Sequence, residues 1–203
     1  MKTTRGLAYL ACAFMVGFVA GIVFSAWKLE KVEAPGHENP IAQKDQKEQN
    51  GQEQIRKRIA GLEQMLSVNP NNVRALVQLG NDYFDIQSYD KAVEAYRKAL
   101  KIDPKDADVL TDMGIAYRRM GKPQEAVDAF RLAVDADPQH ALALFNMGIV
   151  LRDDLKDYAS ALKAWETFLE KAGETPHAVM VRPWVEQLRA KVSESPQGKK
   201  SQE

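Results

Sequence analysis

One interval recurs in the middle of this 203-residue chain, both between equivalent glycines and between equivalent prolines. The markers are Gly80, Gly114 and Gly148, and Pro70, Pro104 and Pro138. A fixed period of this size, about 34 residues, indicates an array of similar supersecondary units rather than one irregular domain. Between the markers, apolar residues recur every three or four positions, and Asp-Pro or Asn-Pro closes each unit. Each unit is therefore predicted to be a pair of amphipathic helices.

The residues inside the units follow one shared pattern. The first unit supplies Leu76, Leu79, Gly80, Tyr83, Ala92, Tyr96, Ala99 and Pro104. The second supplies Leu110, Met113, Gly114, Tyr117, Ala126, Phe130, Ala133 and Pro138. This pattern resembles that of the tetratricopeptide-repeat (TPR) family, in which a large apolar residue, Leu-Gly and Tyr precede Ala, an aromatic residue, Ala and Pro. The resemblance implies an all-α fold, a right-handed helical solenoid.

The third unit departs from the pattern in its second half. It supplies Leu144, Met147, Gly148, Leu151, Ala161, Trp165 and Phe168. One extra residue lies between Arg152 and Tyr158, and Gly173 stands where the closing proline is expected. We expect its second helix to lie at a slightly different angle. In all units the glycines and alanines are predicted to let paired helices approach closely, with the aromatic residues filling the core.

The periodicity also predicts the domain organisation. The TPR domain is placed at residues 52–192, with repeats at about 73–106, 107–140 and 141–174 and flanking helices at 52–68 and 176–192. Thr175 and Pro176 suit the N-cap and first turn of the last helix. Residues 28–51 are predicted to be a flexible linker, because they hold almost no large apolar residues, and residues 193–203 a disordered tail.

An uncharged apolar run precedes the linker. Residues 7–27 would span about 31 Å as a helix, which matches the hydrocarbon core of a bilayer. Residues 1–6 form a stub before it, with Lys2 and Arg5. The run is predicted to be a transmembrane helix, and a cleaved secretory signal is the alternative. The positive-inside rule slightly favours a cytoplasmic N-terminus, hence a single-pass protein of the cytoplasmic (inner) membrane with a periplasmic TPR domain.

Small residues recur every four positions along this run. They are Ala13, Gly17, Gly21 and Ser25. Such a stripe lets another membrane helix approach closely, so a homo-oligomer is possible; ordinary glycine tolerance in a membrane helix is the alternative.

Composition argues against several classes of function. Lys plus Arg equals Asp plus Glu at 28 each, so no overall field attracts nucleic acid. The only cysteine, Cys12, excludes an intramolecular disulfide and a cysteine metal cage. His37, His140 and His177 lie in separate segments without metal-ligand partners at helical spacing. The chain is therefore predicted to be no enzyme and to hold no cofactor or metal.

The resemblance implies that the first helix of each repeat lines a concave, peptide-binding groove. The matching candidates are Val77, Asn81, Phe84, Ile115, Arg118, Arg119, Phe145, Ile149 and Arg152. Such a groove is apolar in the middle and cationic along the edge formed by the three arginines, which suits a peptide with apolar anchors and a carboxylate. A solvated face is the alternative. Some TPR relatives grip a chaperone's C-terminal carboxylate, but at the matching positions Val77, Asp112, Leu142 and Asn146 differ and only Asn81 agrees.

The predicted function is that of a membrane-tethered scaffold that binds a peptide or partner protein. Envelope assembly, as in cytochrome maturation, secretion or pilus biogenesis, is the expected setting, by resemblance to bacterial TPR proteins. A self-assembling structural scaffold and a chaperone-like holdase are the alternatives.

Overall fold

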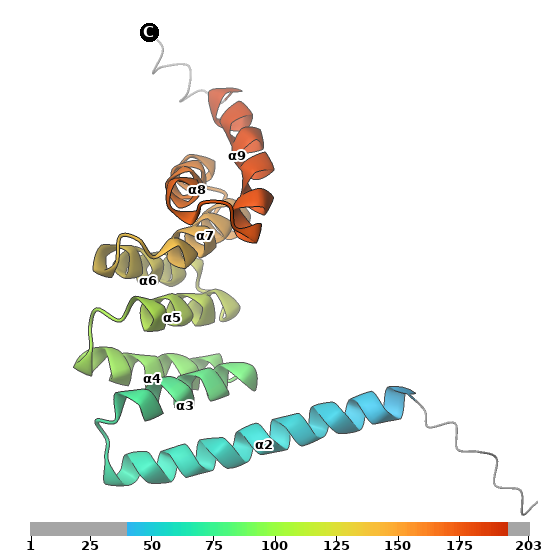
Figure 1. Cartoon of the computed structure of the whole chain (residues 1–203), viewed down its shortest axis with the longest axis vertical. Helices are drawn as coiled ribbons and strands as arrows, with labels where there is room; N and C mark the ends of the chain where they lie inside the picture. Colours follow the sequence, from blue (N-terminus) through green and yellow to red (C-terminus); the bar gives the residue numbers. More distant parts are fainter. Residues whose placement is uncertain (1–39, 195–203) are drawn as a thin grey trace, which may run out of the picture. The chain divides into compact units, whose positions relative to one another are not determined.

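Helices make up the described part of the chain. A computed structural model describes residues 40–194, with side chains from residue 49 onward. In that range the chain forms helices and one π-helical segment, η1, and no strand (Figure 1). The elements are α2 Pro40–Val68, α3 Val73–Asp85, α4 Tyr89–Ile102, α5 Ala107–Arg119, α6 Pro123–Ala136, α7 Ala141–Ile149, η1 Val150–Asp154, α8 Tyr158–Ala172 and α9 Pro176–Glu194. The prediction of an all-α helical array is confirmed for these residues.

Three helix pairs follow one another along the chain. They are α3 with α4, α5 with α6, and α7 with α8, and each pair lies within one of the predicted units. The second helix of each pair also packs against the helix that follows it. The chain divides into two compact units, residues 1–49 and 50–203, and all three pairs belong to the second.

Side-chain caps fix where several helices begin. Asn72 accepts a hydrogen bond from the backbone N–H of Ala75 at 3.1 Å, and Asp106, at the equivalent position of the next repeat, accepts one from Val109 at 3.0 Å. Both side-chain oxygens satisfy an N–H that has no partner inside the helix. Thr175 Oγ1 accepts a hydrogen bond from Ala178 N at 3.2 Å, so the predicted N-cap of the last helix is confirmed.

Glycine and a large ring meet inside every pair. A Cβ atom on Gly80 would lie 2.3 Å from the Tyr96 ring, one on Gly114 2.5 Å from the Phe130 ring, and one on Gly148 2.1 Å from the Trp165 indole. These three rings are almost fully buried, and so are Ala92, Ala126 and Ala161. The helices approach so closely that only hydrogen fits at the glycine, which confirms the predicted role of this spacing.

The extra residue of the third repeat is taken up by η1. The chain changes from α-helix to π-helix over Val150–Asp154, and Leu155 N–H bonds to Val150 O at 3.0 Å. A short π-helical turn holds one more residue than an α-helical turn. The left-handed turn residue moves with it: Gln87 and Gly121 are one period apart, and Lys156 comes one position later than a second period would place it.

The first described helix is longer than predicted. α2 begins at Pro40, so residues 40–51, which composition assigns to a flexible linker, are helical. Gln, Lys and Glu are good helix formers, and proline fits the first turn of a helix. A solvated helix and a disordered tether can therefore have the same composition, which explains why residues 40–51 were predicted to be a linker and are helical.

No helix within residues 40–194 is long and apolar enough to cross a membrane. α2 has the length, at 29 residues, but its sequence is rich in charged and amide side chains, which are costly to bury in hydrocarbon. This finding corrects the prediction of a single-pass protein of the cytoplasmic membrane with a periplasmic repeat domain. The run 7–27, with Ala13, Gly17, Gly21 and Ser25, and the tail beyond residue 194 lie outside the described residues.

Candidate functional site

The side chains of α3, α5 and α7 that face away from the second helices form a surface with two neighbouring hollows, called here the first-helix face. Each hollow has a volume of about 420 Å³. The acidic hollow is lined by Gln78, Asn81, Phe84, Asp85, Tyr96, Asp112 and Ile115. The basic hollow is lined by Ile115, Arg118, Arg119, Phe130, Asn146 and Asp154. Ile115 belongs to both, so one apolar side chain separates them.

The two hollows are the same feature of successive repeats. A shift of one repeat takes Asn81 to Ile115, Tyr96 to Phe130 and Asp112 to Asn146. The same shift takes Phe84 and Asp85 to Arg118 and Arg119. The backbone therefore repeats while the charge changes sign, because these positions face outward and the packing of the core does not constrain them.

Hydrogen bonding orders the floor of the acidic hollow. Tyr96 donates its hydroxyl to Asn81 Oδ1 at 2.8 Å, which leaves the amide nitrogen of Asn81 without a partner among the described residues. Burial is the main cause that raises the pKa of Tyr96, and the charges of Asp112, Asp85 and Asp82 add to it. The phenol therefore stays protonated and remains a donor at physiological pH.

Asp112 carries unpaired negative charge into this hollow. Its carboxylate has no hydrogen-bond or ion-pair partner among the described side chains. Burial, followed by the nearby charges of Asp108 and Asp106, raises its pKa to about 6, against a small opposing effect of His140. Asp85 is exposed on the rim and likewise forms no described hydrogen bond. With a pKa of about 6, the Asp112 carboxyl is mostly ionised at neutral pH.

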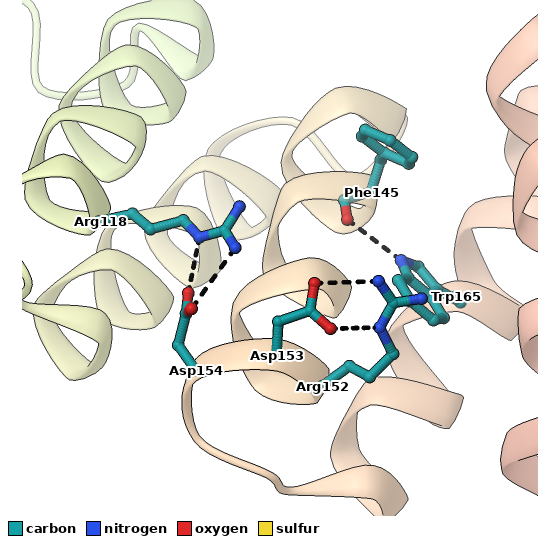
Figure 2. A network of polar contacts seen from close by, with 6 residues as sticks. All are labelled: Arg118, Phe145, Arg152, Asp153, Asp154 and Trp165. Carbon is teal, nitrogen blue, oxygen red and sulfur yellow. Dashed lines mark hydrogen bonds and ion pairs between the residues drawn. The ribbon is translucent and has the colours of Figure 1, made fainter.

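An ion pair reduces the positive charge of the basic hollow. Arg118 Nε lies 2.6 Å from Asp154 Oδ2, and its Nη2 lies 3.4 Å from the other carboxylate oxygen (Figure 2). Asp154 comes from η1, so the segment that absorbs the extra residue brings this carboxylate to the arginine. Arg119 is exposed and has no such partner among the described residues. The cation that remains available in this hollow is therefore Arg119.

Two of the residues expected to line the groove are occupied by internal contacts. Arg152 pairs with Asp153 at 2.5 and 2.9 Å and stacks on Trp184 and Trp165, with 4.2 and 4.8 Å to the ring centroids. That pairing lowers the pKa of Asp153. Phe145 is buried and packs against Phe168 and His177, while its carbonyl accepts a bond from Trp165 Nε1 at 3.1 Å (Figure 2).

Arg152 and Phe145 therefore hold the third repeat and α9 together, so the edge of three free arginines is not present. The remaining candidates are Val77 and Ile149, which are half-buried against the core. Asn81, Phe84, Ile115, Arg118 and Arg119 are the predicted residues that the hollows bring together.

A buried ion pair was missed by the sequence reasoning. Arg58 of α2 makes two bonds of 2.6 Å to the carboxylate of Asp82, which is fully buried in α3 and also accepts a bond from Gln78 at 2.8 Å. Arg58 thus offsets the charge of Asp82 beside the acidic hollow. A charged residue at a core position of the repeat was the available signal, since such a residue needs a partner.

The chemistry that the described residues offer is binding. Within residues 49–194 no group of three or more His, Cys, Asp or Glu side chains is arranged to hold a metal ion. The hollows present an amide donor, carboxylates, an arginine and an isoleucine side chain, which are groups that fix a peptide by charge, hydrogen bonds and apolar contact.

Comparison with known proteins identifies the repeats. Sequence models described as TPR repeat and Tetratricopeptide repeat match residues 80–121 and 111–173. Residues 80–173 are thus similar in sequence to tetratricopeptide repeats. No curated protein sequence matches the chain.

Solved structures share the fold. The TPR domain of Sgt2 from Aspergillus fumigatus is 26% identical, with a TM-score of 0.54, over 63% of this chain and 83% of that one. MamA is 24% identical, with a TM-score of 0.58, over 77% and 90%. The first TPR of Spaghetti (RPAP3), bound to the HSP90 peptide SRMEEVD, is 24% identical, with a TM-score of 0.54, over 60% and 94%.

Proposed function

We propose that the TPR domain is a non-enzymatic binding module that holds a segment of a partner protein across the first-helix face. The observation that carries this proposal is the pair of adjoining hollows with Ile115 between them. They present unpaired charges, a free amide and an apolar side chain on rigid helices, and a preorganised surface lowers the entropic cost of binding.

The contacts inside the third repeat narrow the site. Because Phe145 and Arg152 already pack against α8 and α9, the binding residues are those of α3 and α5, namely Asn81, Phe84, Asp85, Asp112, Ile115 and Arg119. The RPAP3 domain provides a precedent for a peptide on a fold of this kind. Its acidic peptide is not the expected ligand here, because the positions that would hold a terminal carboxylate are occupied by Val77, Asp112, Leu142 and Asn146.

A displayed library of random twelve-residue peptides, panned on the full chain, tests the proposal. Enriched peptides should lose about tenfold or more in affinity with Ile115→Glu, because a central apolar contact becomes a charge. Leu132→Glu is the matched control, since Leu132 is 54% exposed on α6 and lines neither hollow. No enrichment, or equal loss with both variants, would overturn the proposal. Enrichment of the chain's own sequence would instead favour self-assembly.

A further inference from the structure

The two hollows have similar volumes and opposite charge. Asp82, Arg118 and Arg152 are each neutralised by a described partner, namely Arg58, Asp154 and Asp153. Asp106 is occupied as a helix cap, and exposed Asp108 faces His140 at 3.8 Å. The charges left without hydrogen-bond or ion-pair partners in the hollows are Asp85 and Asp112 in the first and Arg119 in the second.

We infer, on the basis of the proposed binding function, that this face selects an extended peptide segment bearing one cationic and one anionic side chain about three residues apart. The cation, Lys or Arg, enters the acidic hollow between Asp85 and Asp112. The anion, Asp or Glu, pairs with Arg119. The residues between them pass over Ile115 and are apolar.

The side chains around each position support this assignment. A guanidinium or ammonium group in the acidic hollow gains two carboxylates, and Phe84, which also lines this hollow, adds an aromatic ring of the kind that attracts cations. A carboxylate at Arg119 can be held by two parallel N–H groups. A peptide with the two charges in reverse order would place like charges together on both sides of Ile115. This repulsion disfavours such peptides and so supplies specificity.

The spacing follows from the geometry of α5. Asp112 and Arg119 lie seven residues apart on this helix, which places them on nearly the same side and about 10.5 Å apart along its axis at about 1.5 Å per residue. A polyproline II segment rises about 3.1 Å per residue and has three residues per turn. Residues i and i+3 of such a segment therefore point the same way, about 9 Å apart, which fits one hollow each.

The same peptide library distinguishes this inference from the function on which it rests. Peptides enriched on the wild-type chain should carry Lys or Arg and Asp or Glu three positions apart, in one chain direction. Binders that depend on Ile115 but show no such charge pair would overturn the inference and leave the proposed function standing. No enrichment at all would overturn both.

Charge reversal gives the second readout. On an Arg119→Glu variant, the acidic position of the enriched peptides should change to Lys or Arg, while the position in the acidic hollow stays cationic. Arg56→Glu is the matched control, because Arg56 is exposed on α2 and has no described ion-pair partner. An unchanged pattern on Arg119→Glu, or the same change on Arg56→Glu, would contradict the assignment of the anion.

Discussion

The charged carboxylate of Asp112 in the acidic hollow lowers the stability of the fold. Its pKa rises from 3.8 to about 6, mainly through burial, so its ionised form is less stable in the folded protein than in the unfolded chain. A raised carboxyl pKa destabilises the fold above the folded pKa, and this penalty is lost as the pH falls below the unfolded pKa. Asp112 therefore carries its charge at neutral pH at the expense of folding stability. Residues of binding sites often have such a cost.

Replacing this carboxyl with a neutral amide should therefore stabilise the fold in a pH-dependent way. Asp112→Asn should raise the free energy of unfolding by about 1–2 kcal/mol at pH 7.5, with solvent screening reducing the full effect of the shift, and by only a few tenths at about pH 4. Urea unfolding at the two pH values checks this. The same gain at both values would mean that the carboxylate charge is not the cause.

The close contact between Gly114 and Phe130 makes a second prediction at this scale. Gly114→Ala should lower the free energy of unfolding by about 2–3 kcal/mol, because the new methyl group overlaps a buried ring. Gly61→Ala is the control, since nothing lies within 4 Å of that Cβ position in α2, and it should be neutral or stabilise by up to about 1 kcal/mol. Thermal unfolding of both variants measures the two changes in stability. Equal changes for Gly114→Ala and Gly61→Ala would refute the packing argument.

Sequence reasoning at the residue scale succeeded where packing imposes a period. Gly80, Gly114 and Gly148 and their facing rings repeat because each pair needs the same close approach. Sequence reasoning did not predict which surface charges are paired. Arg118 and Asp154 are 36 residues apart and meet only because of the path that the chain takes through η1. No local spacing encodes that contact.

At the scale of elements, α2 is joined to α3 through polar side chains. Besides Arg58 and Asp82, Glu63 of α2 accepts a hydrogen bond of 2.5 Å from the Tyr83 hydroxyl. Burial and this bond raise the pKa of Tyr83 to about 12, so the hydroxyl remains a donor. The bonds of Arg58 and Glu63, together with the apolar contacts of Ile59 in the core, therefore hold α2 against α3.

Breaking one of these bonds leaves a charge unpaired. Arg58→Met should lower the free energy of unfolding by about 2 kcal/mol, less than for a fully buried pair because the Arg58 side chain is 48% exposed. The double variant Arg58→Met, Asp82→Leu should recover most of the loss, because the buried carboxylate is then gone. Chemical denaturation of the two variants measures the coupling, and an additive loss in the double variant would contradict it.

Element boundaries show what a single sequence can and cannot predict. Caps such as Thr175 locate a helix start because a side chain must satisfy the first N–H groups. The extra residue near Arg152 was visible as an irregular spacing, but whether the chain would form a loop or a π-helical turn depends on how α7 packs against α6 and α8. The start of α2 at Pro40 was missed because no apolar face marks it.

On the scale of the whole molecule, stability should vary along the array. Each helix pair packs only on its neighbours, so helices with partners on both sides open less often than those at an end. Amide hydrogen exchange should be slowest in α5 to α8 and fastest in α2, which packs on one side only, through the bonds of Arg58 and Glu63 and the apolar contacts of Ile59. Uniform protection across α2 to α8 would show that the array opens as one unit.

The array itself was predictable because a strict repeat period leaves few alternative folds. The expected membrane localisation was wrong, because no helix within residues 40–194 is both long and apolar enough to cross a membrane. The candidate groove residues are brought together only in part: Asn81, Phe84, Ile115, Arg118 and Arg119 line the hollows, while Phe145 and Arg152 pack against α8 and α9. Phe145 and Arg152 can either line the groove or pack against α9, and only the structure of α9 shows which of these two roles they have.

The most direct test of the central claim is where a bound peptide touches the protein. The peptide of highest affinity from the library would be titrated into the full-length protein, labelled at its isoleucine δ1 methyl groups. Methyl NMR would report which of these groups changes its signal. The account predicts that the Ile115 signal shifts in proportion to occupancy, while Ile59 in the core and exposed Ile102 on α4 stay unchanged. Shifts at Ile59 or Ile102 with Ile115 unmoved would place binding elsewhere and contradict the account.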